Sequence, residues 1–323
     1  MHAIRLHEFG PVENLRWEEV EDPEPGAGEV LIDVAASGVH LLDASIRRGD
    51  AMGPFPLPDL PAIPGREVAG VVAATGEGVD EAWMGRRVVA HLGQASRGYA
   101  ERAVTEAARL HALPEGIGEP TAVAMIGTGR TALGILDVAV PGPEDVALVT
   151  GAAGGLGALL VQGARNAGAA VVGAAGGEAK LAQVRALGAT AVDYLDPDWP
   201  VHVRRELGER GVTLVLDGVG GAAGRAALEL LEPGGRIVLF GWSSGAPTEL
   251  NTADLLARSL TASAGLGPHI LRRLRELEER SLAAAAAGEL VPVLDERFTL
   301  ARAAEAHAAL EGRGTVGKVV LVR

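Results

Sequence analysis

The chain has 323 residues, of which 48% are hydrophobic and 22% are charged, a balance that indicates a folded globular protein. Its 42 acidic residues against 29 basic ones give a formal net charge of −13, which disfavours a generic nucleic-acid or anionic-membrane surface. There is no cysteine, so a disulfide framework, a thiolate zinc site and a cysteine nucleophile are excluded.

The sequence also gives an expectation about membranes. Residues 1–22 hold no long apolar run and include acidic residues early, which is not the pattern of a signal peptide. The apolar run Ala283 to Ala287 is too short for a membrane helix, and we expect no other stretch to reach the necessary length. The sequence therefore predicts a soluble, cytoplasmic protein without a membrane or nucleic-acid partner.

Residues 1 to about 110 carry short strand patterns separated by turns. Runs of Val, Ala and Ile bounded by glycine predict strands over residues 28–39, 66–76 and 85–93. The segment Met52–Gly65 contains five prolines, which excludes a regular helix or a central strand. We expect an exposed loop there, and long loops often lie over binding sites.

From about Thr121 the pattern changes to strands that alternate with helices. Residues 121–139 have a helical composition apart from their glycines. Strands are predicted over 146–150, 170–174, 191–194, 213–217 and 236–240, helices over 156–167, 178–187, 222–231 and 269–290, and a last strand in the tail 314–323. This alternation predicts an α/β fold with a parallel sheet and helices on both faces.

The stretch 146–169 reads as a strand, a glycine turn and a helix. It satisfies G-x-x-G-x-x-G over Gly151–Gly157 and also T-G-x-x-x-G-x-G over Thr150–Gly157. Glycines let the chain turn tightly out of the strand, and the start of the helix then offers its N–H groups to a pyrophosphate. The alternative is an ordinary strand–helix turn, which the following strand at the expected distance disfavours.

The strand after this turn bears on the choice of nicotinamide cofactor. An NAD site expects an Asp or Glu at the end of that strand, but "VVGAAGG" ends it with small residues. Lys180 is able to neutralise a 2′-phosphate, although it is also explained as a solvated helix residue. Glu178 is counter-evidence, but a Glu at a helix N-terminus is explained by the helix dipole. The pattern favours NADPH.

The second spelling of the turn is typical of short-chain dehydrogenases, which work through a Tyr-x-x-x-Lys pair. The chain has two tyrosines, and four residues beyond Tyr99 and Tyr194 stand Ala103 and Asp198. Neither is that pair. The turn also follows about 145 residues of β-rich chain. The short-chain interpretation therefore fails.

The order of the motifs along essentially the whole chain resembles the medium-chain dehydrogenase/reductase superfamily. The matching stretches are "GEVLIDVAASGVHLLD", "PAIPGREVAGVVAATGEGV", "GYAE", "AAGGLG", "AVDY", "VLDGVGG", "LEPGGRIVLFGWSSG" and "GKVVLVR". The resemblance implies a GroES-like β-barrel domain over residues 1–120, completed by about 266–323, and a Rossmann domain with a doubly wound parallel sheet over 121–265. It also implies a homodimer.

Zinc alcohol dehydrogenases of this superfamily show C-G-x-C-H-x-D and G-H-E, where this chain has "SGVHLLD" and "GREVAG". His40 stands in the place of a ligand cysteine and Arg66 in that of a ligand histidine, and a guanidinium does not ligate a metal. Catalytic zinc needs three protein ligands that converge, and the sequence gives no sign of such a set. A new site made of His40, Glu67 and His91 is therefore disfavoured. We expect no metal, and the chain resembles the zinc-independent quinone oxidoreductase branch, with "AAGGVG" and "FGxSSG" motifs.

In that branch NADPH delivers hydride to a quinone or an α,β-unsaturated carbonyl, while the protein orients and shields it. The resemblance implies that the glycine turn holds the pyrophosphate and that other residues contact the 2′-phosphate side and the nicotinamide half. The implied cofactor residues are Thr131, Gly151, Ala153, Gly154, Gly155, Leu156, Gly157, Gly176, Lys180, Tyr194, Val219, Phe240, Gly241, Trp242 and Ser243.

His40 and Ser45 are the predicted catalytic positions, where the branch commonly has Asn and Tyr. His40 is expected to hydrogen-bond the acceptor carbonyl or to donate a proton, and its alternative is a structural histidine bonded to a backbone carbonyl. Arg66 either attracts an anionic substrate group or forms an ion pair at the barrel surface with Glu67 or a neighbour. Asp43 is expected to cap a helix.

Three functions stay open at this point. The first is an NADPH-dependent oxidoreductase that acts on a small-molecule hydride acceptor such as a quinone. The second is an enoyl or alkenal double-bond reductase of a biosynthetic pathway. The third is a non-catalytic NADPH-binding sensor, because fold alone does not fix function.

Overall fold

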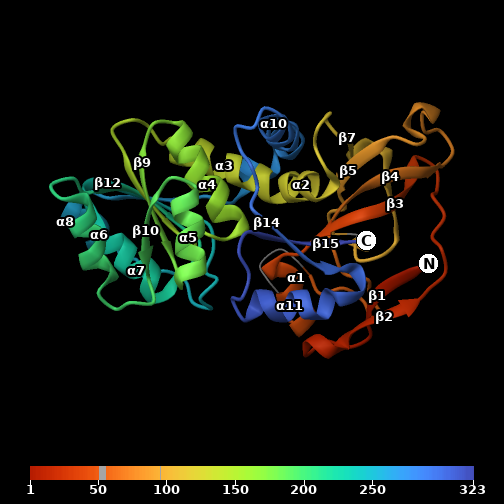
Figure 1. Cartoon of the computed structure of the whole chain (residues 1–323), viewed down its shortest axis with the longest axis horizontal. Helices are drawn as coiled ribbons and strands as arrows, with labels where there is room; N and C mark the ends of the chain where they lie inside the picture. Colours follow the sequence, from red (N-terminus) through yellow and green to blue (C-terminus); the bar gives the residue numbers. More distant parts are fainter. Residues whose placement is uncertain (51–55, 95) are drawn as a thin grey trace. The chain divides into compact units, whose positions relative to one another are not determined.

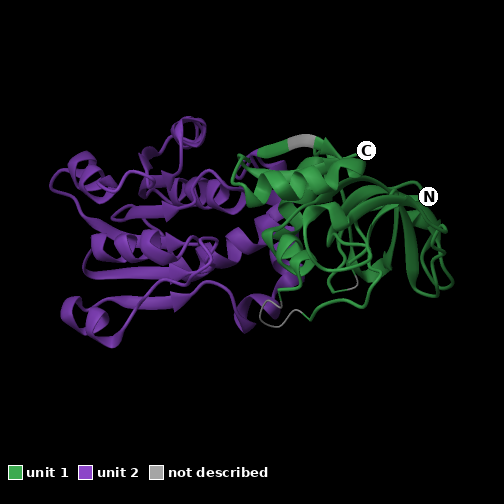
Figure 2. Cartoon of the chain, turned by 90° about the horizontal axis from the view of Figure 1, so that it is seen from below, with its two compact units in different colours: residues 1–127, 294–323 green, residues 128–293 purple. Residues whose placement is uncertain are grey.

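The computed structural model describes residues 1–50, 56–94 and 96–323, except for the side chains of residues 296 and 297. The chain forms two compact units: unit 1 comprises residues 1–127 and 294–323, and unit 2 comprises residues 128–293 (Figure 2). The predicted limits at 121 and about 266 differ from these. Residues 267–293 stay with unit 2, where Ile270 and Leu277 pack against Gly134 of α3 (Arg130–Ala139).

Unit 1 is built on a seven-stranded sheet with the order β14-β15-β3-β4-β5-β7, in which β6 also pairs with β3. The strands are β3 (Glu29–Gly38), β4 (Glu67–Thr75), β5 (Arg87–His91), β6 (Arg102–Glu106), β7 (Leu110–Ala112), β14 (Leu294–Thr299) and β15 (Lys318–Val322). Only β14 and β15 pair in parallel among these. The predicted strands 28–39, 66–76 and 85–93 are confirmed as β3, β4 and β5.

Alternating apolar residues of this sheet form one core, with Val30, Ile32, Val34, Val68, Val72 and Val88 fully or almost fully buried. A second core lies under the hairpin of β1 (His2–Leu6) and β2 (Leu15–Glu19) and under α11 (Ala303–Glu311). Helix α1 (Leu41–Arg48) follows β3 directly. Short 3-10 turns occur at Val12–Asn14, Glu81–Trp83, Ala107–Arg109 and Leu300–Arg302.

The proline-rich segment predicted as a loop is described only in part. Residues 51–55 lie outside the described residues. Residues 56–65 contain neither a helix nor a strand, apart from one isolated bridge between Leu6 and Ala62. For these described residues the loop prediction is confirmed.

Unit 2 contains a six-stranded parallel sheet with the order β10-β9-β8-β11-β12-β13. The strands are β8 (Val146–Thr150), β9 (Ala170–Ala175), β10 (Thr190–Asp193), β11 (Val212–Asp217), β12 (Leu231–Leu239) and β13 (Thr261–Ala264). Numbered from β8, this is the 3-2-1-4-5-6 order of a dinucleotide-binding Rossmann fold. The predicted Rossmann sheet is therefore confirmed.

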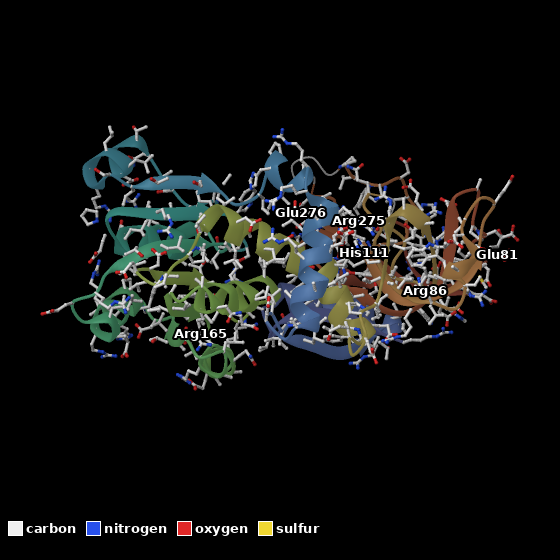
Figure 3. All side chains as sticks on the ribbon, turned by 90° about the horizontal axis from the view of Figure 1, so that it is seen from above. Glu81, Arg86, His111, Arg165, Arg275 and Glu276 are labelled. Atoms are coloured by element: carbon white, nitrogen blue, oxygen red, sulfur yellow. The ribbon has the colours of Figure 1, made fainter. Side chains whose placement is uncertain are left out.

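Helices alternate with these strands and can be followed in Figure 1. They are α4 (Gly155–Asn166), α5 (Glu178–Ala186), α6 (Trp199–Leu207), α7 (Gly221–Leu230), α8 (Thr252–Arg258), α9 (Pro268–Leu271) and α10 (Leu274–Ala286). Arg165, labelled in Figure 3, donates from Nη1 to the carbonyl of Leu187 at 2.7 Å and so ties α4 to the end of α5.

Three elements of unit 2 were not predicted, namely α6, α8 and β13, which are only nine, seven and four residues long. The single helix expected over 269–290 is divided into α9 and α10. Strand β12 begins at Leu231, earlier than the predicted residue 236, because Leu231 pairs with Val212 of β11.

One helical stretch corrects the expectation about membrane-helix length. Helix α2 (Glu119–Ala124), a π-helical segment (Met125–Gly129) and α3 together form 21 residues that are long and apolar enough to cross a bilayer by length and composition. Of the apolar window, 67% is buried inside the structure, as in the core helix of a water-soluble protein. A single stretch of this kind is weak evidence for a membrane span.

Candidate active site

The turn after β8 requires glycine at two positions, Gly151 and Gly157. Gly151 has a φ of +63°, in the left-handed region. A Cβ on Gly157 would lie 2.2 Å from the carbonyl oxygen of Gly151, so a side chain there would push α4 away from the strand. Gly154 is the N-cap of α4, and its N–H donates to that same oxygen at 3.0 Å. The turn presents the N-terminus of a 12-residue helix at a strand end, which suits a pyrophosphate.

The carboxyl ends of β8, β9, β11 and β12, together with the loops that follow them, form what we call the cofactor edge. Crossovers leave β8 and β11 toward opposite sides of the sheet, which opens a crevice at the point where ligands bind in such folds. Most of the predicted cofactor residues lie on this edge.

Asp217 organises the centre of the cofactor edge and was missed as a site residue, although it ends an apolar strand in the "VLDGVGG" motif. Its carboxyl group is fully buried, and Thr150 Oγ1 donates to its Oδ1 at 2.6 Å. The N–H groups of Val219 and Gly220 donate to the same oxygen at 3.0 and 3.2 Å. One carboxylate thus fixes the ends of β8 and β11 and the loop after β11.

The predicted nicotinamide residues lie beside this loop. A Cβ on Gly218 would lie 2.3 Å from Phe240 Cε2, so the ring packs directly on the backbone. The N–H of Ser243 donates to the carbonyl of Gly218 at 3.1 Å, and Trp242 is 52% exposed. Val219 Cγ2 lies 3.3 Å from the position of a Cβ on Gly151. The structure therefore brings these residues to the glycine turn.

The predicted 2′-phosphate residues lie at the end of β9. A Cβ on Gly176 would lie 3.3 Å from Tyr194 Cε2, and the half-buried Lys180 is in the first turn of α5. Glu178 pairs with Arg185 at 2.6 Å on the exposed side of this helix. Asp193 accepts hydrogen bonds from the N–H groups of residues 177 and 195, so a carboxylate also stands in this loop.

The remaining predicted cofactor residues are placed as follows. Gly155 and Leu156 open α4, and Ala153 is buried in the turn before it. Gly241 lies between Phe240 and Trp242 at the cofactor edge. Thr131 is half-buried in the first turn of α3, and its contact with a cofactor stays a prediction.

In unit 1, His40, Glu67 and Lys318 meet although they are far apart in the sequence, and we call them the His40 group. Lys318 Nζ lies 2.8 Å from His40 Nε2, 3.2 Å from Glu67 Oε2 and 3.1 Å from the carbonyl oxygen of Val39. His40 Nε2 is also 2.8 Å from Glu67 Oε2. The side chains of Glu67 and Lys318 are buried, whereas that of His40 is 27% exposed.

Sheet pairing explains why these residues meet. The ends of β3, β4 and β15 are adjacent, because Ser37 pairs with Val68 and Gly38 pairs with Val320. A Cβ on Gly38 would lie 2.1 Å from Glu67 Oε2, and one on Gly127 would lie 1.6 Å from Oε1. The carboxylate therefore fits against two glycines that leave it room.

The charges of the His40 group act on one another. Complete burial raises the pKa of the Glu67 carboxyl, but the charges of His40 and Lys318 outweigh burial and hold that pKa well below its ordinary value. Burial lowers the pKa of the Lys318 ammonium against the attraction of Glu67. The imidazole is the member of the group that solvent reaches most.

Asp43 links His40 to a second buried cluster. Its Oδ2 accepts a hydrogen bond from the N–H of His40 at 2.8 Å, which confirms the predicted helix-capping role, and another from Tyr99 Oη at 3.2 Å. Arg66 Nε lies 3.8 Å from its Oδ1, so Arg66 pairs with a neighbour inside the unit rather than at its surface. Burial lowers the pKa of His307, 3.2 Å from Tyr99 Oη, to about 4.

Ser45, the second predicted catalytic position, is buried in α1 and accepts a hydrogen bond from Arg48 Nη2 at 3.1 Å. The donor set beside His40 does not fit a metal, because Lys318 contributes an ammonium and Arg66 a guanidinium. His91 Nδ1 accepts from the N–H of Gly93 at 3.0 Å. Among the described residues no three His, Cys, Asp or Glu side chains are placed to hold a metal ion.

Comparisons with known proteins agree with this architecture. Residues 26–132 match the model of the alcohol dehydrogenase GroES-like domain, and residues 155–279 match that of zinc-binding dehydrogenases. The chain is 31% identical to 2-haloacrylate reductase of a Burkholderia species and 32% identical to quinone oxidoreductase of Sus scrofa, over 99% and 100% of this chain and 98% of each relative.

Two solved structures extend the comparison. Escherichia coli quinone oxidoreductase complexed with NADPH superposes with a TM-score of 0.87 at 28% identity. An NAD-dependent alcohol dehydrogenase superposes with a TM-score of 0.87 at 32% identity. Both alignments cover 100% of each chain.

The Rossmann sheet, its glycine turn and these relatives define an NAD(P)-binding oxidoreductase. The chain belongs to the medium-chain dehydrogenase/reductase superfamily, in its quinone oxidoreductase-like branch. The predicted fold class, a Rossmann sheet with a GroES-like domain, is confirmed.

Proposed function

We propose that the protein is a zinc-independent oxidoreductase that uses NADPH to deliver hydride to a quinone or another conjugated carbonyl acceptor. The observation that carries the proposal is the glycine turn at Gly151–Gly157, which admits no side chain at Gly157 and opens a helix whose N–H groups suit a pyrophosphate. The relatives named quinone oxidoreductase support the acceptor class.

NADPH supplies the hydride when it is bound, and the residues of the chain bind and orient it. The glycine turn would hold the pyrophosphate. Lys180 and Tyr194 would contact the 2′-phosphate side, Thr131 the nicotinamide ribose or amide, and the segment from Phe240 to Ser243 with Val219 the nicotinamide half. An ammonium beside a 2′-phosphate favours NADPH over NADH.

His40 is the proposed proton donor. An acceptor that receives hydride also needs a proton at oxygen or carbon, and an imidazole is suited to supply it near neutral pH. Lys318, 2.8 Å from His40 Nε2, is placed to return a proton to the ring, while Glu67 stays ionised between them. Ser45 is proposed to contact the acceptor beside His40.

A second candidate is an enoyl or alkenal double-bond reductase, which the relative named 2-haloacrylate reductase favours. The two candidates share the cofactor and the proton donor and differ in the acceptor. A quinone gains hydride and proton on oxygen or on a conjugated carbon, whereas an enone is reduced at its carbon–carbon double bond.

Cofactor binding is the direct test. NADPH and NADH are titrated into the wild type and Lys180→Ala by fluorescence, with Arg185→Ala as the matched control because Arg185 pairs with Glu178 on the same helix. We expect Lys180→Ala to weaken NADPH binding about tenfold and to leave NADH binding unchanged, since one charge-assisted contact is lost. Equal binding of both cofactors to the wild type would contradict the 2′-phosphate assignment.

The acceptor is then identified with a panel of quinones and enones, by following NADPH consumption. Consumption with at least one class supports the proposal, and tight NADPH binding without consumption points to a non-catalytic sensor. Substituting His40 by Gln is expected to lower turnover about 100-fold while leaving NADPH binding intact, within the usual range for a lost general acid.

We also propose a cytoplasmic homodimer. Strand β13 is one edge of the unit 2 sheet within the described part of the chain, and Leu256 of the preceding helix α8 is 82% exposed. An edge strand with apolar neighbours favours pairing with another chain. Light scattering after size exclusion checks the assembly, and a monomer at all concentrations would contradict it.

A further inference from the structure

Unit 1 contains a cavity of about 870 Å³, within the range of sites that bind small molecules. Its lining combines apolar side chains with charged ones, among them Ile46, Ile63, Asp43, Arg66 and Arg97. The cavity is formed wholly by residues of unit 1.

Arg66 places a buried positive charge in this wall. Its side chain is only 10% exposed, and its Nε lies 3.8 Å from Asp43 Oδ1, at the outer limit of an ion pair. The other oxygen of Asp43 accepts from the N–H of His40 and from Tyr99 Oη. Asp43 thus contacts three groups, and it places Arg66 in the same cluster as the backbone N–H of His40.

Three other charged residues of the wall have different surroundings. Arg47 is buried but bound to Glu311 at 2.7 Å through both carboxylate oxygens and to the carbonyl of Gly10 at 2.6 Å. Arg97 and Asp59 are exposed, where water screens their charge. The planar donors of a buried guanidinium match two carboxylate oxygens at once, so Arg66 is suited to bind an anion in this wall.

We propose that Arg66 binds the carboxylate of the acceptor, so that the substrates of this protein include α,β-unsaturated carboxylic acids. This inference rests on the proposed function and specifies its substrate class. The apolar side chains of Ile46 and Ile63 then contact the hydrocarbon part of the acid. The carboxylate of the acid pairs with Arg66, close to the hydrogen bond between Asp43 and the N–H of His40.

The chemistry explains why such an acid requires a cation. The β-carbon receives the hydride, the π electrons of the double bond move toward the carboxylate, and an ene-diolate with two negative charges forms. The α-carbon then takes a proton from His40, which leaves a saturated carboxylate and oxidised cofactor. A carboxylate alone opposes this build-up of charge, whereas the Arg66 guanidinium balances it at the oxygens where it develops.

The first experiment compares a charged acceptor, 2-chloroacrylate, with its uncharged methyl ester, and uses 1,4-benzoquinone as a third acceptor. Arg66→Met is expected to lower kcat/KM for the acid about 100-fold more than kcat/KM for the ester or the quinone, because only the acid loses a charge-assisted contact. Arg97→Met, the same charge change on an exposed residue of the same cavity, is expected to change the acid less than about threefold.

Equal losses for acid and ester in Arg66→Met would overturn the inference, and so would an equal loss for the acid in Arg97→Met. Thermal unfolding and NADPH titration of each variant separate loss of fold from loss of binding. If Arg66→Met does not fold, Arg66→Lys replaces it, with an expected loss for the acid of about tenfold, since an ammonium lacks the paired donors.

A binding experiment separates this inference from the proposed function. Calorimetry is done with 2-chloropropionate, a saturated acid that is not reduced. We expect it to bind the wild type and to bind Arg66→Met at least about tenfold more weakly, since a charge-assisted contact is lost. The methyl ester of this acid is expected not to bind. Binding through Arg66 without reduction of any acceptor would support the carboxylate site and contradict the proposed function. If quinones are reduced but 2-chloropropionate does not bind and 2-chloroacrylate is not reduced, the carboxylate site alone is overturned.

Discussion

The cofactor edge of unit 2 and the His40 group of unit 1 are built by opposite means. At the cofactor edge, backbone turns and glycines define the space, and one buried carboxylate, Asp217, ties the strand ends together. In the His40 group, three charged or titratable side chains define the chemistry, and Lys318 lies 278 residues from His40 in the sequence. A substitution therefore acts through backbone displacement in the first region and through uncompensated charge in the second.

The largest expected effect is at Glu67. Replacing Glu67 by Gln leaves the buried Lys318 ammonium without its carboxylate, and we expect a loss of about 3–5 kcal/mol in the free energy of unfolding. Urea unfolding at pH 7 measures it. The double variant Glu67→Gln/Lys318→Met is expected to recover most of the loss, because no unpaired charge remains. A single variant that loses less than about 1 kcal/mol would contradict the account of this ion pair.

His307 provides the next effect, which depends on pH. Burial lowers its pKa from 6.5 to about 4 in the folded state. As pH falls from 6.5 to about 4, the unfolded state binds a proton that the folded state does not, so stability falls over that window, by about 3 kcal/mol in total.

The variant His307→Gln tests this dependence, because Gln does not titrate. We expect its free energy of unfolding, measured by urea at pH 7, 5.5 and 4, to lack this fall. His2→Gln is the control, since His2 is exposed. An identical pH profile for wild type and His307→Gln would contradict the assignment.

The smallest expected change in stability is at the cofactor edge, where the backbone rather than charged side chains defines the site. Gly157→Ala places a Cβ 2.2 Å from the carbonyl oxygen of Gly151, and overpacking of this kind costs about 1–3 kcal/mol. We expect NADPH binding to fall more than about tenfold, because α4 shifts away from the pyrophosphate. Gly142→Ala is the control, since no atom lies within 4 Å of that Cβ. Unchanged binding in Gly157→Ala would show that the turn does not hold the cofactor.

The same contrast explains how far the sequence predicts the molecule. In unit 2, apolar runs and glycines are local signals, so β8, β9, β10, β11 and the helices α4, α5 and α7 are predicted to within one residue at each end. The glycine turn is predicted for the same reason. Asp217 was not predicted, because its hydrogen bonds to Thr150 and to the N–H groups of the loop after β11 form only when the sheet folds. No residue spacing in the sequence indicates them.

In unit 1 the sequence predicts His40 as a site residue but not its partners. Lys318 stands in a strand pattern where nothing marks it as buried, and only the pairing of β15 with β3 brings it to His40. The sequence gives no sign that the His40 side chain contacts Lys318 and Glu67, because both residues lie far from it along the chain. One of the two alternatives for Arg66 was an ion pair at the barrel surface, but its side chain is buried and lies 3.8 Å from Asp43 of α1.

Hydride is proposed to pass from NADPH to a conjugated acceptor, and an isotopic label follows this transfer directly. The protein is incubated in ordinary water with an α,β-unsaturated carbonyl acceptor and NADPH that carries deuterium at the transferred position, and the product is analysed by mass spectrometry and NMR. We predict one deuterium at the β-carbon and a solvent-derived hydrogen at the α-carbon. A reduced product without deuterium, or no acceptor-dependent oxidation of NADPH, would contradict the account.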